Sequence, residues 1–243
     1  MGTRLRILFN DIDERFQKAV KEFWGFRRSQ QDRQLEAGKQ DAGTRGSVTG
    51  GGHMESIELL IYDSLLSAGV PKGDIHIRKA LELPGYYRPE KKWDLLVIKD
   101  NQLLLCLELK SQVGSFGNNF NNRSEEAIGN AEDFWTSFRE GYFGKQVPLL
   151  GFLFLLEDVP KVHTKVKVVE TNFKVDPVFV GSGYAKRYQV LMERLVLERK
   201  YTTTCLTLTT RGNPSRVTFP CESHSFRQFV LAIEAHVSRF YTC

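Results

Sequence analysis

Residues 93–110 read WDLLVIKDNQLLLCLELK and contain two apolar runs separated by a short polar segment. The runs Trp93–Ile98 and Leu103–Lys110 have the length and apolar content of two adjacent strands in a β-hairpin. The second run has five apolar residues in succession, which is typical of a strand that is covered on both faces. We therefore expect the hairpin to lie within a sheet that helices cover.

The second strand ends in two charged residues, Glu108 and Lys110. Burying an unpaired charge costs several kcal/mol or more, so both side chains need partners, a metal ion or an open cleft. Because they are two residues apart on a strand, they point to the same face and lie roughly 7 Å apart along it. This pair is the main candidate for a functional site.

Asp94 begins the first strand, and the register of the hairpin decides whether it lies near Glu108. A three-residue loop, residues 100–102, would pair Asp94 with Glu108 and place both carboxylates on one face. A two-residue loop would pair Asp94 with Leu107 and turn the aspartate away. We expect the first register.

Two nearby carboxylates repel one another unless a cation lies between them, and oxygen ligands suit a hard ion such as Mg²⁺. We expect Asp94 and Glu108 to bind the ion, which would neutralise a phosphate and lower the pKa of a bound water. Lys110 would add a positive charge beside that water. Glu58, or alternatively Glu55, could supply a third carboxylate from the helix before the sheet. The competing interpretation is an ordinary hairpin with solvated charges at its end.

The remaining sequence predicts a mixed sheet flanked by helices, which is an α/β (α+β) fold class. Helices are expected at Asp11–Trp24, Met54–Ala68, Ser124–Glu140, Ala185–Lys200 and Ser225–Phe240. Further strands are expected at Asp74–Ala80, Pro148–Leu156, Val162–Val169 and Tyr201–Thr209. Loops are expected at Arg27–His53, around Pro84 to Pro89, and at Phe116–Arg123. We predict one domain over 1–243, with a helix and a polar, glycine-rich loop in 1–52 and the catalytic core in 53–243.

Composition excludes some classes of protein but does not identify the function. With 41% hydrophobic and 26% charged residues in 243, the chain is ordinary for a soluble globular protein. A net charge of +5 permits a polyanionic partner without requiring one. The four cysteines lack the close pairs of zinc or redox sites, and no apolar run approaches the ~20 residues of a membrane span. We expect free thiols and a cytoplasmic location. The five histidines show no metal-ligand spacing, although His53 stands beside the helix that carries Glu58.

Asp94 followed by Glu108-Leu109-Lys110 resembles the active-site motif of the PD-(D/E)xK nucleases, with Trp93 in place of the proline. Three longer segments are similar to the XhoI family of type II restriction enzymes: ELPGYYRPEKKWD (82–94), LELKSQVGSFGNNFNNRSEEA (107–127) and YAKRY (184–188). These segments identify a family more specifically than Asp94, Glu108 and Lys110 do by themselves.

The resemblance implies a restriction-endonuclease-like core and a homodimeric, Mg²⁺-dependent enzyme in a bacterial cytoplasm. Such an enzyme would cut double-stranded DNA at or around the palindrome CTCGAG and leave short 5′ overhangs, while a cognate methyltransferase protects the host DNA. Palindromy suits two identical subunits that read two identical half-sites. The alternatives are a structure-specific or repair nuclease of the same fold and a non-catalytic DNA-binding protein.

The candidates for sequence reading lie in the expected loop after the catalytic strand: Asn118, Asn119, Asn121, Asn122 and Arg123. Asparagine can pair bidentately with adenine and arginine with guanine. The alternative is an asparagine-rich turn that caps the following helix.

Four more residues complete the predicted DNA contacts. We expect Arg88, Lys91 and Lys92, just before Asp94, to contact phosphates. Gln112, on the strand face of Lys110, could orient water or a phosphate, or be a plain strand-end glutamine.

Overall fold

The computed structural model describes residues 11–36, 51–212 and 215–241, with a six-stranded mixed sheet at its centre. In spatial order its strands are β1 (Ile75–Ile77), β4 (Leu95–Lys99), β5 (Gln102–Gln112), β6 (Leu149–Glu157), β7 (Thr203–Thr209) and β8 (Val217–Thr218). The β5–β6 and β6–β7 pairs are parallel, and the β1–β4, β4–β5 and β7–β8 pairs are antiparallel. The α/β class with a mixed sheet is confirmed.

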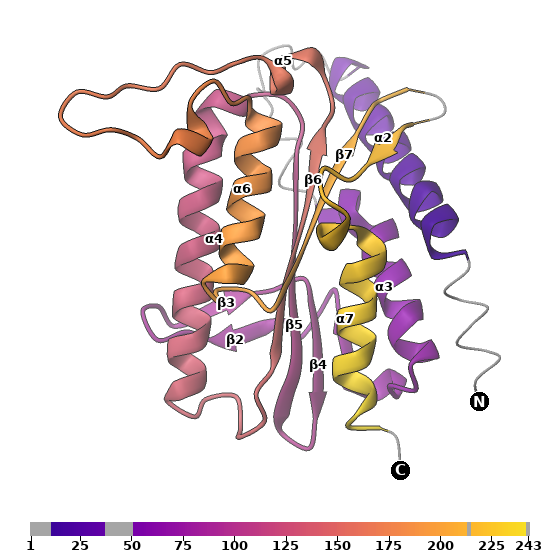
Figure 1. Cartoon of the computed structure of the whole chain (residues 1–243). Helices are drawn as coiled ribbons and strands as arrows, with labels where there is room; N and C mark the ends of the chain where they lie inside the picture. The colour runs from indigo at the N-terminus through magenta and orange to yellow at the C-terminus, as the bar shows by residue number, and fades with distance from the viewer. Residues whose placement is uncertain (1–10, 37–50, 213–214, 242–243) are drawn as a thin grey trace.

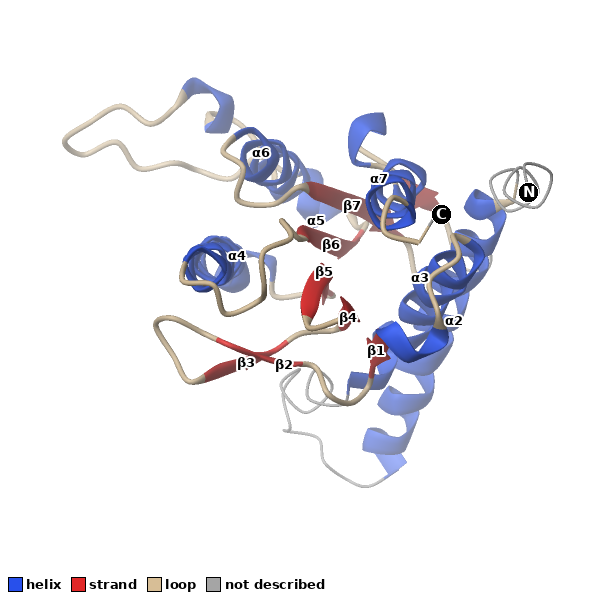
Figure 2. Ribbon diagram, turned by 90° about the horizontal axis from the view of Figure 1, so that it is seen from below, coloured by secondary structure: helices blue, strands red, loops and turns tan. Residues whose placement is uncertain are grey.

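Helices cover both faces of this sheet (Figures 1 and 2). On one face lie α2 (Ile12–Glu36), α3 (Glu55–Ser67) and α7 (Phe226–Ser238), and on the other lie α4 (Phe116–Arg139) and α6 (Tyr184–Leu197). The short α5 (Pro160–His163) follows β6, and short 3₁₀ helices are η1 (Gly51–Met54), η2 (Lys72–Asp74), η3 (Pro177–Phe179) and η4 (Glu222–His224). A small separate hairpin, β2 (Glu82–Pro84) and β3 (Glu90–Lys92), lies on the α4 side of the sheet (Figure 2).

The central strands are buried on both faces, as their continuous apolar runs predict. Every residue of β6 is buried, and β5 is buried from Leu103 to Leu109. Along β5 the side chains alternate, so Leu105, Leu107 and Leu109 face α7 while Cys106 faces α4. Glu108 therefore faces α4 from a strand that is otherwise apolar.

The turn between β4 and β5 differs from the expected three-residue loop. Lys99 pairs with Gln102, so the turn has two residues, Asp100 and Asn101, with φ of 49° and 58°. Positive φ at both central positions is the geometry of a type I′ turn, which follows the right-handed twist of the strands. The expectation of a three-residue loop is therefore wrong.

A β-bulge restores the expected register at the far end of the hairpin. Ile98 pairs with Leu103 but Val97 pairs with Leu105, so Leu104 is an extra residue on β5. Beyond the bulge Leu95 pairs with Leu107, and Asp94, directly before β4, donates its backbone N–H to the Leu107 carbonyl over 3.1 Å. The expected register thus holds as far as Leu95, and it brings Asp94 close enough to Glu108 for their charges to interact.

Two other segments fold differently from their sequence-based predictions. The predicted loop Phe116–Arg123 is helical, because the chain turns at Gly114 and Ser115, both at positive φ, and Phe116 then enters the core. Ser124, the expected N-cap, instead donates its hydroxyl to the Phe120 carbonyl within α4. Helix α4 therefore begins eight residues earlier than expected.

The predicted strand Val162–Val169 is also absent: α5 occupies its start and residues 164–169 form no ladder. Pro160 starts α5, and the side chains after it are mostly exposed. Residues 164–182 form an arm that stands away from the body beside α4 and α6 (Figure 1). Helix α2 continues to Glu36, so only residues 37–50 of the predicted N-terminal loop lie outside the described part of the chain.

Cys106, Cys205 and Cys221 are free thiols, as expected, and Cys243 lies outside the described residues. Within those ranges, no helix combines the length and apolar character needed to cross a membrane.

Candidate active site

Glu108 is the most buried charged residue of the site, with 1% of its surface exposed. Its Oε1 accepts hydrogen bonds from the ammonium groups of Lys110 (2.8 Å) and Lys91 (3.1 Å), and its Oε2 accepts one from the Asn130 amide (2.9 Å). Burial acts to raise the pKa of Glu108, but the two lysines outweigh it and lower the pKa below its usual value. Glu108 is therefore a carboxylate at neutral pH.

Asp94 joins this group from the neighbouring strand. Its Oδ2 accepts a hydrogen bond of 2.7 Å from the backbone amide of Leu109. Burial raises its pKa and the negative charge of Glu108 raises it further, against the opposing effects of Lys110 and the Leu109 amide. The structure thus brings Asp94, Glu108 and Lys110 close enough to shift one another's pKa.

The Lys110 side chain lies between acidic groups. Burial favours the neutral amine, but the carboxylates of Glu108 and Asp94 outweigh this effect and raise the pKa of Lys110. A third carboxylate, Glu126 on α4, lies 3.8 Å from its ammonium nitrogen. Lys110 is therefore a positive charge at the point where both strands present their acidic side chains.

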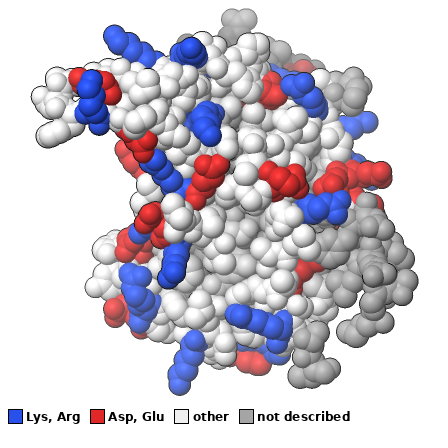
Figure 3. Space-filling model, viewed as in Figure 1, with Lys and Arg blue, Asp and Glu red and all other residues white. Residues whose placement is uncertain are grey.

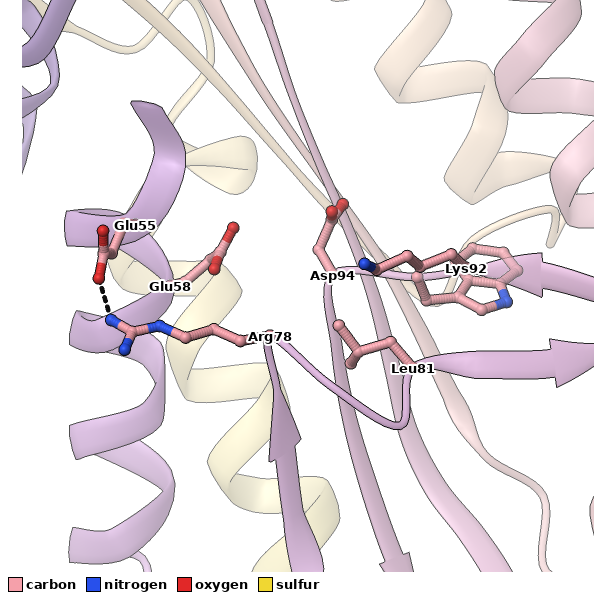
Figure 4. A pocket seen from close by; sticks show the side chains of 7 residues that line it. Glu55, Glu58, Arg78, Leu81, Lys92 and Asp94 are labelled. Atoms are coloured by element: carbon pink, nitrogen blue, oxygen red, sulfur yellow. Dashed lines mark hydrogen bonds and ion pairs between the residues drawn. The ribbon is translucent and has the colours of Figure 1, made fainter. Parts of the chain in front are cut away.

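A cleft of about 420 Å³ opens beside Asp94 (Figure 4). Its lining comprises Glu55, Glu58, Arg78, Leu81, Lys92, Trp93 and Asp94. Glu58 points across the cleft toward Asp94, whereas Glu55 forms an ion pair with Arg78 (Figure 4). Burial, and then the charge of Asp94, raise the pKa of Glu58 to about 7. Of the two glutamates on α3, Glu58 is the one that interacts with Asp94.

The donor set of this site fits a hard divalent cation. Burial is the main cause that raises the pKa of both Asp94 and Glu58, and the charge of Asp94 raises that of Glu58 further. Oxygen ligands of this kind suit a hard cation. In the described part of the chain, however, no three His, Cys, Asp or Glu side chains already converge on one point. Glu108 Oε1 accepts from both Lys110 and Lys91, whereas Oε2 accepts only from Asn130 and keeps a second lone pair that a cation could use.

Comparison with known proteins identifies the family. The family model of restriction endonuclease XhoI matches residues 33–220, which include all of these side chains. This chain belongs to the XhoI restriction endonuclease family. It is 41% identical over 212 residues to the type II restriction enzyme BstVI of Geobacillus stearothermophilus, covering 84% of this chain and 95% of that protein.

Other relatives agree with this assignment. The chain is 44% identical over 167 residues to the type II restriction enzyme AbrI of Azospirillum brasilense, covering 68% of this chain and 75% of the relative. It is 42% identical over 192 residues to the type II restriction enzyme XhoI of Xanthomonas vasicola, covering 77% of each chain. No solved structure matches. As a XhoI-family member the chain is a type II restriction endonuclease, a class of site-specific deoxyribonucleases, and its helix-covered mixed sheet is consistent with the restriction-endonuclease-like fold.

In this XhoI-family enzyme the basic residues before Asp94 have different surroundings. Lys91, expected at phosphates, is 11% exposed, bonds to Glu108 and lies 4.0 Å from the centre of the Trp93 ring. Arg88, also expected at phosphates, is bonded to two residues of α4, as described below. Lys92 is exposed and lines the cleft, which is the open position that a phosphate contact needs.

Gln112 does continue the strand face of Lys110, but it is buried, with 4% of its surface exposed. Its side-chain oxygen accepts a hydrogen bond from the Tyr188 hydroxyl, and its nitrogen donates to the Gly114 carbonyl (3.3 Å). These bonds join β5 to α6 and to the turn before α4. The side chain lies in the interior rather than on an open surface.

The candidate sequence-reading residues lie on the first two turns of α4 instead of on a loop. Asn118, Asn121 and Asn122 are exposed, and Asn119 is half-buried. Arg123 is paired with Glu126 at 2.5 Å. Three asparagines therefore remain accessible on a helix that follows β5 in the chain.

Two residues near the site escaped the sequence analysis. Asn130 and Asp133 are 6% and 5% exposed, within the apolar stripe of α4 that contains Ala127, Ala131 and Phe134. Two polar residues on a buried helix face are a signal that sequence alone can provide, because each must find a buried partner.

His53, which the sequence analysis noted for its position beside the helix of Glu58, lies with its ring centre 6.0 Å from that of Phe23.

Proposed function

We propose that this enzyme hydrolyses phosphodiester bonds in double-stranded DNA with Mg²⁺ as cofactor, using Asp94, Glu108 and Lys110. One observation carries the proposal: a buried carboxylate, a second carboxylate from the adjacent strand and a lysine ammonium meet beside an open cleft. A DNA-binding protein without catalytic activity has no need for such a group, because the carboxylates repel a phosphate.

Bound Mg²⁺ supplies charge neutralisation at the scissile phosphate and a more acidic water. The oxygens of Asp94 and Glu108 would hold the ion, and Glu58 would add negative charge from the opposite wall of the cleft. Lys110 keeps its ammonium beside Glu108, where it stabilises negative charge that develops on the phosphate and on the attacking oxygen. Lys92 contributes a phosphate contact at the cleft mouth, and that contact positions the duplex.

The finer specificity follows from the family. We infer a homodimer that cuts each strand once at a CTCGAG-like palindrome, leaves 5′ overhangs, and works in the bacterial cytoplasm beside a cognate methyltransferase. Asn118, Asn121 and Asn122 are the residues we assign to base contacts. The face seen in Figure 3 mixes basic and acidic side chains without one continuous basic patch. We place the DNA at the cleft because Asp94, Glu58 and Lys92 line it.

Digestion of a sequenced plasmid with Mg²⁺, followed by mapping of the ends, tests activity, site and overhang together. We expect discrete fragments with short 5′ extensions at CTCGAG-like sites, and no cutting in EDTA. Asp94→Ala and Glu108→Ala should each reduce cutting by about 10²–10³-fold or more, because they remove interactions worth several kcal/mol. Glu132→Ala, which removes an exposed carboxylate paired with Lys200, serves as the matched control.

The same digestion separates the alternatives. A smear or ladder in place of discrete fragments would favour a structure-specific or repair nuclease of the same fold. Absence of cutting at every divalent cation tested, with specific duplex binding retained, would favour a DNA-binding protein. A shifted recognition sequence in Asn118→Ala or Asn122→Ala, with the cutting rate on preferred DNA preserved, would support the assignment of base contacts.

A further inference from the structure

Asn130 of α4 is the only described residue outside the lysines that donates a side-chain hydrogen bond to Glu108, over 2.9 Å to Oε2. The other oxygen of Glu108 already receives Lys110 and Lys91. Asn130 is buried, with 6% of its surface exposed, so its amide contributes little to the outer surface. It therefore holds Oε2 of Glu108, the oxygen to which neither lysine bonds.

The orientation of the Asn130 amide is set by Arg88. A guanidinium offers only donors, so the amide oxygen of Asn130 must face Arg88, whose terminal nitrogen lies 2.8 Å from it. The amide nitrogen must then face Glu108. Without Arg88 the amide could rotate by half a turn and place its oxygen against the carboxylate, which is repulsive.

Arg88 is itself held in place. Its Nε donates to Asp133 Oδ2 over 2.7 Å, and Asp133 Oδ1 accepts the backbone amides of Tyr86 (2.8 Å) and Tyr87 (2.9 Å). A Cβ on Gly85 would lie only 2.9 Å from Asp133 Oδ2, so the tip of the hairpin fits closely against α4. A continuous chain of hydrogen bonds thus runs from the β2–β3 hairpin through Arg88 and Asn130 to Glu108.

We propose that Asn130 is a positioning residue for cleavage, which orients the Glu108 carboxylate toward the bound cation, and that Arg88 acts only by orienting Asn130. This inference rests on the proposed function. It replaces a phosphate contact for Arg88 with a role inside the protein. Residues that orient a metal-binding side chain typically change metal affinity or activity by about 10–100-fold when removed.

The variants Asn130→Ala, Asn130→Asp, Arg88→Met and the double variant Arg88→Met/Asn130→Ala test the proposal in the full-length chain. Asn130→Asp keeps the size and the Arg88 contact but replaces the donor with an acceptor. The control is Thr136→Val, also buried on α4, whose hydroxyl bonds to Arg139 rather than to Glu108. The measurements are the single-turnover cutting rate, the DNA dissociation constant in EDTA, and the rise in Tm that Mg²⁺ produces without DNA.

We expect Asn130→Ala to cut about 10–100-fold more slowly, with a smaller Mg²⁺-induced rise in Tm and a DNA dissociation constant in EDTA within threefold of wild type. Asn130→Asp should be at least as slow despite its matched shape. The double variant should be no slower than Asn130→Ala, because both changes act through one carboxylate. Thr136→Val should cut within about twofold of wild type.

Three results would overturn the inference: near-normal cutting by Asn130→Asp, multiplying losses in the double variant, or an unchanged Mg²⁺-induced rise in Tm in Asn130→Ala. A wild-type chain that does not cut with Mg²⁺ rejects the proposed function, yet its Mg²⁺-induced rise in Tm still tests Asn130. If the wild-type Tm does not respond to Mg²⁺ either, both proposals fail. Asn130→Asp keeps the test valid should Asn130→Ala fold poorly.

Discussion

The Asp94 carboxylate lies 2.7 Å from the backbone nitrogen of Leu109, the residue between Glu108 and Lys110. This bond crosses the hairpin and ties the first carboxylate to the main chain that carries the other two side chains. The neighbouring pair, Leu95 with Leu107, stands in the register that the Leu104 bulge restores. The geometry of the site therefore depends on the turn at the far end of the same hairpin.

The conformation of this turn can be tested directly. Asn101 has φ of 58°, where a β-branched side chain is strained and glycine is not. We expect Asn101→Val to lower the free energy of unfolding by about 1–2 kcal/mol. Asn101→Gly should change it by less than about 0.5 kcal/mol and leave cutting unchanged. Urea titration measures both, and equal stability of the two variants would show that the turn differs from the one described.

Glu58 should make the metal-free protein sensitive to pH. Its pKa in the folded protein is raised to about 7, so the fold is favoured while the group is protonated and loses stability as pH rises through 7. In EDTA at pH 8, Glu58→Gln should raise Tm by on the order of 2 °C, and the gain should vanish near pH 5. Glu55→Gln is the matched control, because Glu55 is paired with Arg78 and should gain nothing. A larger gain in the control would contradict the assignment of Glu58 to the Asp94 side of the cleft.

Lys91 should compete with the cation for Glu108. Its ammonium lies 3.1 Å from Oε1 and is mostly buried, so its removal leaves Glu108 with less positive charge. We expect Lys91→Met to have a lower Tm than wild type in EDTA. Addition of Mg²⁺ should then raise the Tm of Lys91→Met by more than it raises that of wild type. Lys92→Met, which changes the exposed neighbour, should show neither effect. Differential scanning fluorimetry across Mg²⁺ concentrations measures this, and a weaker Mg²⁺ response in Lys91→Met would refute competition.

The Tyr188–Gln112 contact should be structural. Tyr188→Phe leaves the buried Gln112 oxygen without its donor, so we expect a loss of about 1–3 kcal/mol in the free energy of unfolding. The DNA dissociation constant in EDTA should stay within twofold of wild type, as measured by fluorescence anisotropy. Weakened DNA binding without any loss of stability would contradict the structural role and support the original prediction that Gln112 contacts DNA.

Local patterns were sufficient for much of the fold. The runs Pro148–Leu156 and Tyr201–Thr209 became β6 and β7, and the helical spacing in Ser225–Phe240 became α7, with Ser225 accepting the Gln228 amide as N-cap. Continuous apolar runs and helical periodicity depend only on near neighbours in the chain. Val162–Val169 failed because an alternating pattern forms a strand only where a sheet edge receives it, and none does there.

What the sequence by itself determined is the composition of the site: Asp94, Glu108 and Lys110 on a hairpin, with Glu58 on the helix before it. Only the tertiary structure decided how these residues meet. The two-residue turn alone would have turned Asp94 away, and the bulge at Leu104 corrects it.

The partners of Glu108 were likewise decided in three dimensions. The sequence predicted phosphate contacts for Lys91 and Arg88, yet packing of the β2–β3 hairpin against α4 brings Lys91 to Glu108 and Arg88 to Asn130. The physical reason is that a buried charge must be neutralised by whichever donors the fold brings within about 3 Å, and those donors come from segments remote in sequence. Periodicity carries no information about such contacts.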